Sequence, residues 1–496
     1  MNVLGETFLE HLPFDQLLTS PVRVINRACT GLVEESECDP LTFEKCLGGI
    51  IKNDEFYVYD NIYGSFTITP LQKFFIDHPL FTRLQNVSQL GALTAVRRIQ
   101  GHNRYHHCIG TMYVVSRITE HLVKLGPENH GISKEAAICA QLSALCHDLG
   151  HGPNSHMFED ALATHLREMK DKDADYPDVI IDHEYRSILL FKAIFKDAVS
   201  KKVPGAKSIT KEMERVIMAG IDLDCYLKYF APETKEDSIS KNYPGLPSWA
   251  NAIIGITSHT IGADRIDYLA RDSYWLQGNI PEEIGSNNIW NIYNRTRIID
   301  GKWAFDLRDQ HNIERIVDLR NFMFIHYYNG RDSNSISLTY LSILSDMGTL
   351  ARPIFEAVLP DKAKGITAKD KLTIRKYYKN GWCKLTDDNV LNILEYIATR
   401  ENNQQLRERV DGYPSVLERI KAVRQGQPLC YPIENTIAIP NTSDSKNVFI
   451  LPARSTKSWE TSKNVVFYCS SPSGIILVDA QTVKIGTMYV MQKIEG

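Results

Sequence analysis

Histidines and aspartates gather in one part of this 496-residue chain, and their spacing is suited to metal chemistry. Ten of the fifteen histidines lie within residues 102–183. In the string CHDLGHGPNSH, His147, His151 and His156 follow one another at spacings of four and five, around two glycines and a proline. His147 precedes Asp148, so a single helix end would offer an imidazole nitrogen and a carboxylate oxygen, both common ligands of divalent ions. This segment predicts metal or acid–base chemistry.

Two other segments offer further ligands. The upstream string GHNRYHHCIG contains three histidines, His102, His106 and His107. The downstream string GADRIDYLARD contains five functional side chains within nine positions, Asp264, Asp267, Tyr268, Arg271 and Asp272. Alone, each string also fits a surface or salt-bridged helix. Together with CHDLGHG they predict one metal centre, with His107, His147, Asp148 and Asp264 as possible ligands, although of the three upstream histidines only one need be a ligand.

Composition and charge exclude several other classes of protein. The net charge of −4 excludes nucleic-acid binding through gross positive charge. Ten cysteines without any CxxC pair argue against a disulfide framework and against thiolate-bound zinc; Cys108, Cys139 and Cys146 are expected to be buried thiols. The chain has no run of eighteen apolar residues, and its N-terminus lacks the order of a signal peptide. We expect a soluble intracellular protein without membrane contact, either nuclear or cytosolic.

Helices must position these side chains. The alternating residues 56–68 predict a hairpin closed around Asn61 to Gly64. Helical periodicity predicts the helices that follow, at residues 71–76, from Pro79 through FTRLQNVSQLGAL, at 104–125, from a cap at Ser133 to His147, at 183–198 and at 253–276. Short β-like runs appear much later, at NVFILPA, NVVFYCS and GIILVDA.

These motifs resemble the HD-domain metallohydrolase superfamily, and within it the dGTPase-like deoxynucleoside triphosphate triphosphohydrolases that in animals often carry a SAM domain. The resemblance is carried by YDNIYGSFTITP, PLFTRLQNVSQLGAL, GHNRYHHCIGTMY, LCHDLGHGPNSHMFE, IDHEYRSILLF and GADRIDYLARD, and more weakly by CKLTDDNVLNILEYI and NVVFYC. It is good over residues 56–280 and patchy beyond 350. The implied fold is mainly α, with an N-terminal helical accessory segment (1–54), an HD-type helical catalytic domain that begins with the short hairpin (55–350) and a smaller C-terminal α/β lobe (351–496).

The resemblance also implies roles for individual residues. The metal, which could be iron, zinc, manganese or magnesium, would be held by the four ligands predicted above. Histidines 151 and 156 would lie beside the substrate phosphates, and His183 would be the general acid. Substrate contacts are implied for Gln89 and Leu90 at the nucleoside, for Arg104 and Arg265 at the phosphates, and for Tyr268 and Asp272 at the deoxyribose.

Farther along, this sequence departs from the family pattern of an arginine, a histidine four residues later and a tyrosine eight residues later, all at the triphosphate. Arg320 and Tyr328 keep the spacing, but Phe324 occupies the histidine position. An ungapped register would instead place Phe322 and His326 there.

The activator site of the guanine-nucleotide-regulated relatives is matched only at Asp77. Thr82 and Gln85 stand where those relatives have an amide and an arginine, and Phe56 stands in place of a lysine. We therefore expect no activation by a guanine nucleotide.

Three functions remain open. The first is metal-dependent hydrolysis of deoxynucleoside triphosphates to deoxynucleoside and triphosphate, by a dimer or tetramer as in relatives. The second is a phosphodiesterase or nucleotidase that acts on monophosphates or nucleic-acid ends. The third is a non-catalytic HD protein that regulates or binds single-stranded nucleic acid. The lysine-rich stretch 361–379 is expected to be a solvated surface loop; the functional alternatives are a phosphate-binding edge at a subunit contact and a weak single-stranded nucleic-acid surface.

Overall fold

The β-hairpin at the start of the described chain forms where the alternating pattern predicts it. The computed structural model describes residues 56–170, 181–231, 246–258, 261–351, 354, 383, 385–400, 404–408, 414–429, 466–471 and 474–478. Strands β1 (Phe56–Asp60) and β2 (Gly64–Ile68) pair antiparallel, with Asp60 opposite Gly64. The buried Asp60 carboxylate accepts the amide protons of Ile62 and Tyr63, at 2.8 and 3.1 Å, which fastens the turn.

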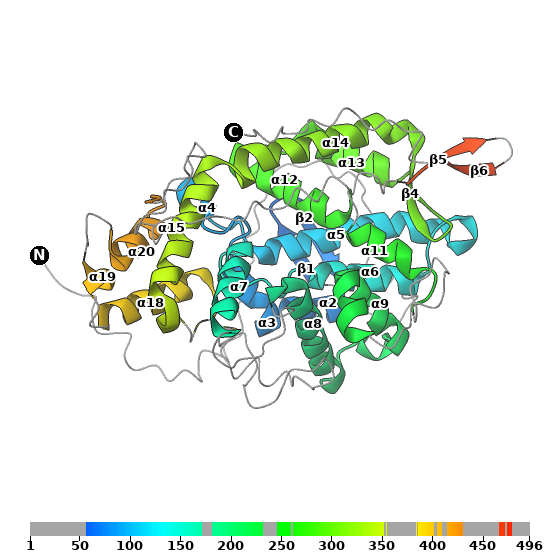
Figure 1. Ribbon diagram of the computed structural model, residues 1–496. Helices are drawn as coiled ribbons and strands as arrows, with labels where there is room; N and C mark the ends of the chain where they lie inside the picture. The colour runs from blue at the N-terminus through cyan, green and yellow to red at the C-terminus, as the bar shows by residue number, and fades with distance from the viewer. Residues whose placement is uncertain are drawn as a thin grey trace, which may run out of the picture. The chain divides into compact units, whose positions relative to one another are not determined.

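Five helices form the centre of the molecule, and their ends follow from local sequence. Helix α5 (Arg104–Leu125) has the predicted bounds, because the Asn103 side chain caps its first turn and Gly126 ends it. The Ser133 hydroxyl caps α6 (Lys134–Cys146), as predicted. These two helices lie side by side (Figure 1) and contact α9 (Lys211–Ile221), α11 (Ala250–Ser258) and α12 (Ala263–Gln277). The three predicted buried cysteines all lie in this core.

The remaining elements surround this centre. The longer helices are α7 (His156–Lys170), α8 (His183–Ser200), α13 (Ser286–Tyr293), α14 (Gln310–Met323), α15 (Arg331–Met347), α18 (Asp387–Arg400) and α20 (Val416–Arg424). Short helices are α2 (Pro70–Ile76), α3 (Pro79–Thr82), α4 (Leu93–Arg97), α10 (Leu223–Cys225) and α19 (Gln404–Arg407). A π-helical turn (Phe324–Tyr328) continues α14.

Two predicted helices are interrupted. The helix expected from Pro79 ends at Thr82 and passes through a 3-10 turn (Arg83–Asn86), because the next residues extend and hydrogen-bond to the segment before α5. The amide of Arg104 donates to the Val87 carbonyl at 2.9 Å. The single helix expected over 253–276 is in fact the pair α11 and α12, with Gly262 in an extended conformation before α12.

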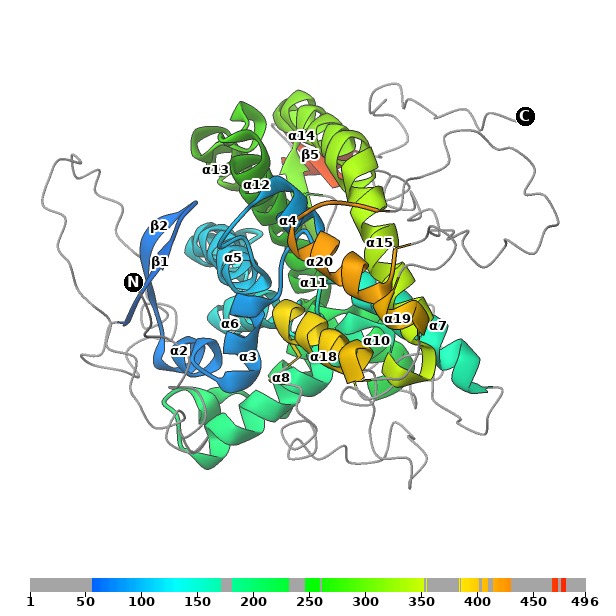
Figure 2. The same cartoon turned by 90° about the vertical axis from the view of Figure 1, so that its left-hand side faces the viewer.

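Strands from distant parts of the chain share one sheet. Its order is β3 (Arg297–Ile299), β4 (Lys302–Asp306), β5 (Val466–Ser471) and β6 (Gly474–Val478), with β4 and β5 parallel. Two of the three predicted β-like runs are therefore confirmed as strands. The division near residue 350 stays a prediction. Two contacts cross this position: β5 pairs with β4, and α20 packs against α15 (Figure 2).

The mainly helical fold class is confirmed. All described residues belong to a single compact unit, residues 41–496. The predicted accessory segment 1–54, the lysine-rich stretch 361–379 and the run NVFILPA lie outside the described residues. Within the described ranges, no helix has both the length and the apolar character needed to cross a bilayer.

Candidate active site

The four predicted metal ligands converge from three helices. His107 lies on α5, His147 and Asp148 directly follow α6, and Asp264 lies in the first turn of α12. The Nε2 atoms of the two histidines are 3.2 Å apart. One Asp264 carboxylate oxygen lies 3.0 Å from the His107 Nε2 and 3.3 Å from the His147 Nε2, and an Asp148 oxygen lies 3.4 Å from the His107 Nε2.

The hydrogen bonds of the two histidines make this cluster a suitable site for a divalent ion. The Nδ1–H of His107 donates to Asp267 at 2.7 Å, and the Nδ1–H of His147 donates to the Ala144 carbonyl at 2.8 Å. In these tautomers both Nε2 atoms carry lone pairs, so two acceptors face each other in a buried place, which is unfavourable unless a cation lies between them. Two imidazoles and two carboxylates suit iron, zinc, manganese or magnesium.

The carboxylates around His107 also favour a positive charge at this site. Burial lowers the pKa of this imidazole, but the carboxylates of Asp264, Asp267 and Asp148 outweigh burial and raise the pKa to about 10. The negative groups around His107 thus favour a proton where no metal ion is bound.

A buried ion-pair network supports His107 from behind. Asp267 accepts two hydrogen bonds from Arg271, at 2.9 and 3.0 Å, and Arg271 also pairs with Asp60 of the hairpin at 3.0 Å. All three side chains are almost fully buried. Asp267 thus contacts a predicted metal ligand directly, and the sequence analysis assigned it no role. The sequence did contain a clue to this contact, because Asp267 follows Asp264 by three positions and therefore lies near the same face of the helix.

A cavity of about 550 Å³ opens beside the metal ligands. Of the predicted metal ligands, His107, Asp148 and Asp264 line it, whereas His147 does not. All three predicted catalytic histidines line it as well, namely His151, His156 and His183. Six of the predicted substrate-binding residues line it, Gln89, Leu90, Arg104, Tyr268, Asp272 and Tyr328. Arg265 and Arg320 do not line this cavity.

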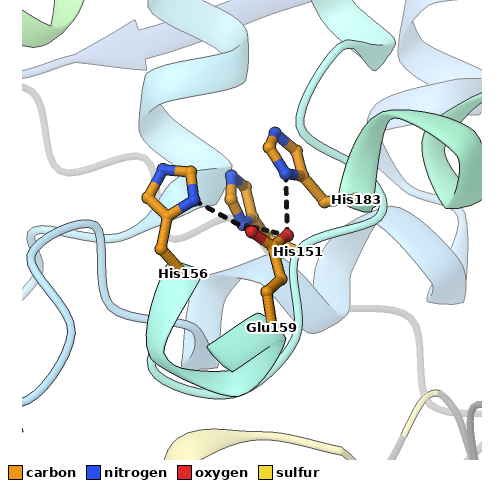
Figure 3. A group of neighbouring side chains, drawn as sticks. All are labelled: His151, His156, Glu159 and His183. Atoms are coloured by element: carbon orange, nitrogen blue, oxygen red, sulfur yellow. Dashed lines mark hydrogen bonds and ion pairs between the residues drawn. The ribbon is translucent and has the colours of Figure 1, made fainter. Parts of the chain in front are cut away.

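The three histidines predicted to be catalytic surround Glu159, a residue that the sequence analysis missed. Figure 3 shows His151, His156 and His183 arranged around its carboxylate. The His183 Nδ1 lies 2.7 Å from Glu159, and the His156 Nδ1 donates to Glu159 at 3.0 Å. Burial lowers the pKa of His183, but Glu159 and Glu184 raise it to about 9, so this imidazole is positively charged at neutral pH.

His151 differs from its neighbour in charge. Its ring stacks on that of His183 with centroids 3.8 Å apart and an interplanar angle of 17°. Burial, together with the Arg104 guanidinium and His183, keeps the pKa of His151 well below its usual range. Neither ring nitrogen has a hydrogen-bond partner among the described residues. The nitrogen and oxygen atoms of His151, His156, Glu159 and His183 that could bind an ion all lie within 4.8 Å of one another, and with His183 protonated this cluster is suited to hold protons and phosphate oxygens.

Arg104 connects the metal ligands to the cavity wall. Its guanidinium pairs with Asp148 and donates to the Ser155 hydroxyl at 3.0 Å. Although burial opposes ionisation, Arg104 is the main cause that holds the pKa of Asp148 well below its usual range, so Asp148 is a carboxylate at neutral pH.

The opposite end of the cavity is built around Asp272. One Asp272 oxygen lies 2.6 Å from the His102 Nε2, and the Tyr328 hydroxyl donates to the other at 2.5 Å. The Arg320 Nε donates to the Tyr268 hydroxyl at 3.2 Å, so Arg320 supports a cavity residue without reaching the cavity.

The structure places the residues of the two alternative registers differently. Phe324 and Tyr328 face the cavity, whereas Phe322 and His326 are exposed. The Arg320 guanidinium lies 4.3 Å from the centre of the Phe324 ring. An aromatic ring thus packs against the Arg320 guanidinium beside the cavity.

Comparisons with known proteins agree with this site. The HD domain family model matches residues 104–219, which contain His107, His147 and Asp148. The chain is 30% identical over 225 residues to the human deoxynucleoside triphosphate triphosphohydrolase SAMHD1, a match that covers 44% of this chain and 33% of the human protein. It is 28% identical over 358 residues to the HD domain-containing protein L394 of Acanthamoeba polyphaga mimivirus, which covers 69% of this chain and 64% of that protein. The matched part thus spans about a third of the human relative's length.

Similarity also extends to a solved structure. A phosphohydrolase of Bacteroides thetaiotaomicron, BT4208, superimposes with a TM-score of 0.52 at 18% sequence identity, covering 75% of this chain and 76% of that one. The two proteins share a fold.

Proposed function

Because this chain belongs to the HD-domain phosphohydrolases and is a distant relative of SAMHD1, we propose that it hydrolyses deoxynucleoside triphosphates to deoxynucleoside and inorganic triphosphate. One observation carries the proposal. A single cavity places the metal-ligand set beside a histidine that Glu159 keeps protonated. The names of the animal relatives supply the substrate class.

The chemistry divides between the ion and the side chains. A divalent ion held by His107, His147, Asp148 and Asp264 would act as a Lewis acid toward the phosphates and would increase the acidity of water. Arg104 and the neutral His151 would bind phosphate oxygens, because both line the cavity next to Asp148.

His183 would supply the leaving group with its proton. As the oxygen of a water molecule bonds to the α-phosphorus, the bond from phosphorus to the 5′-oxygen breaks, and the 5′-oxygen takes a proton from the His183 imidazolium. The attacking water releases a proton to solvent, and His183 takes up a proton again after turnover. Its Nε2 lies on the side of the ring that faces Asp148, at 3.8 Å, while its Nδ1 stays with Glu159. His156, half-exposed at the cavity, would contact the phosphates from the other side of Glu159.

The far end of the cavity would bind the nucleoside. Gln89 and Leu90 offer a polar and an apolar contact for base and sugar. The Tyr268 ring would pack on the deoxyribose. Asp272, which His102 and Tyr328 position, would accept a hydrogen bond from the 3′-hydroxyl group. Arg265 does not line the cavity, so its phosphate contact stays a prediction. A homo-oligomer and a nuclear or cytosolic location also stay predictions.

Product analysis tests the proposal. The purified protein is incubated with manganese or magnesium and each of the four deoxynucleoside triphosphates, and the products are separated by anion-exchange chromatography. We expect deoxynucleoside and intact triphosphate. Release of inorganic phosphate or of a nucleoside monophosphate would contradict this and favour the phosphodiesterase or nucleotidase alternative.

Removal of a metal ligand should abolish metal binding and turnover together. We expect His147→Ala and Asp148→Ala to lose bound metal, measured by inductively coupled plasma mass spectrometry, and to lower kcat at least about 1000-fold. His311→Ala is the control, since this side chain is 82% exposed on α14. A ligand variant with full turnover would contradict the proposal.

A further inference from the structure

One carboxylate from the C-terminal part of the described chain joins two loops of the cavity. Asp387 is the first residue of α18. Its Oδ2 accepts a hydrogen bond from the Ser88 amide, with an N–O distance of 2.9 Å. Its Oδ1 accepts a hydrogen bond from the Asn154 amide, with an N–O distance of 2.6 Å. We call residues 87–91 the nucleoside loop, since they include Gln89 and Leu90, and residues 152–156 the histidine loop, since they end at His156. The three segments meet although they are 233 and 299 residues apart.

The two loops adopt backbone conformations that need support. Asn154 and Ser155 are consecutive non-glycine residues that both have φ of +57°, in the left-handed region. Gly91 of the nucleoside loop has φ of +56°, and a Cβ there would lie 2.9 Å from the Asn154 carbonyl oxygen. The loops are therefore in direct contact and locally strained, and such strain persists only where surrounding groups hold it.

Hydrogen bonds carry this arrangement to the metal ligands. The Ser155 hydroxyl donates to the Ser88 carbonyl at 2.6 Å and accepts from the Arg104 Nε at 3.0 Å. Arg104 in turn pairs with Asp148. The position of the histidine loop thus affects both the nucleoside loop and the guanidinium beside the metal site.

A second side chain fastens the segment that carries Asp387. The buried Arg83 donates to the Leu385 carbonyl at 3.0 Å and to the Leu149 carbonyl at 3.1 Å. Arg83 therefore links the segment 385–387 to the backbone just before the histidine loop. This gives the Asp387 carboxylate a defined position relative to the amides that it accepts.

We propose that Asp387 is a positioning residue of the nucleotide pocket, which sets the distance between the nucleoside contacts at Gln89 and Leu90 and the phosphate contact at His156. The proposal rests on the proposed function for its substrate, a nucleoside triphosphate. Asp387 itself does not line the cavity and does not act on the reacting atoms. It acts only through the two backbone amides.

The test compares Asp387→Asn with Asp388→Asn. The first variant keeps one acceptor oxygen and turns an amide N–H₂ group toward the second backbone donor, so one of the two loops is released. The second variant removes the same charge from the exposed neighbouring residue of the same helix. Hydrogen–deuterium exchange with mass spectrometry then follows peptides that contain Ser88 and Asn154.

We expect about tenfold faster exchange of these two peptides in Asp387→Asn, with α5 and α6 unchanged. We also expect KM for the deoxynucleoside triphosphate to rise about tenfold, with a smaller change in kcat and unchanged bound metal. Asp388→Asn should match the wild-type protein in every measurement. Unchanged loop exchange and KM in Asp387→Asn would overturn the proposal, and so would faster exchange throughout the helical core, which would indicate a general structural role.

The wild-type protein provides a measurement that does not depend on folding of the variant. The amides of Ser88 and Asn154 should be protected in it, and exchange at the rate of free loop amides would overturn the proposal. Failure of the proposed function would be seen separately, as absence of deoxynucleoside triphosphate turnover by the wild-type protein.

Discussion

His183 and His151 stack on each other, yet they hold different charges. The carboxylate of Glu159 contacts His183 and keeps it protonated, whereas burial and Arg104 keep His151 neutral. A charged and a neutral imidazole 3.8 Å apart offer the substrate an acid and a polar contact in one place. The pH dependence of turnover should therefore report the environment of one residue.

Glu159→Gln should move the alkaline limb of the pH profile to lower pH. A general acid must be protonated, so wild-type kcat should fall only as the pH rises through about 9, the pKa of His183. Without the Glu159 charge the imidazolium loses its main stabilising partner, and the fall should begin roughly one to two pH units lower. Steady-state kcat between pH 6 and 10 measures this.

The matched control for that experiment is Glu184→Gln. Glu184 lies 3.3 Å from His183, but its side chain is 35% exposed, so water screens its charge. We expect a clearly smaller shift of the alkaline limb. Equal shifts in the two variants would contradict the assignment of Glu159 as the main partner.

At the scale of elements, α5 and α12 approach each other closely because α5 has a glycine at the contact. A Cβ on Gly110 would lie 2.0 Å from an Asp267 oxygen and 2.2 Å from an Arg271 nitrogen. The missing side chain thus leaves room for the ion pair that orients His107. The metal site depends on this helix contact as well as on its ligands.

Gly110→Ala should therefore destabilise the protein and weaken metal binding. The added methyl group displaces a buried, paired charge, and we expect the free energy of unfolding in urea to fall by roughly 3 kcal/mol. Gly255→Ala in α11 is the control, because its Cβ would meet its nearest neighbour at an ordinary 3.6 Å. That change should be neutral or stabilise by up to about 1 kcal/mol. Similar losses in both variants would rule out a specific role for the Gly110 contact.

At the scale of the whole molecule, features that depend on neighbouring residues could be predicted and those that depend on distant contacts could not. The caps at Asn103 and Ser133 lie next to the helices that they start, so α5 and the start of α6 follow from the sequence. The break after Thr82 arises from pairing of Ser88 with Asn103, which no helical period reveals. The same holds for the contacts of Asp387 and for the parallel pairing of β4 with β5.

We also predict that turnover of the whole protein is independent of added GTP. Thr82 lacks the side-chain amide, and Gln85 lacks the positive charge, that the resemblance implies for an activator site at these two positions. Initial rates with each deoxynucleoside triphosphate, measured with and without GTP, check this. Strict dependence on GTP would show that another surface binds the activator.

The two opposed nitrogens of His107 and His147 have a consequence for metal uptake. Where no ion is bound, a proton on His107 relieves their repulsion, and its pKa of about 10 means that this proton is present at neutral pH. An entering ion must displace it, so each ion taken up releases about one proton to the solvent. Metal affinity should then rise with pH, and the heat of binding should depend on the ionisation enthalpy of the buffer.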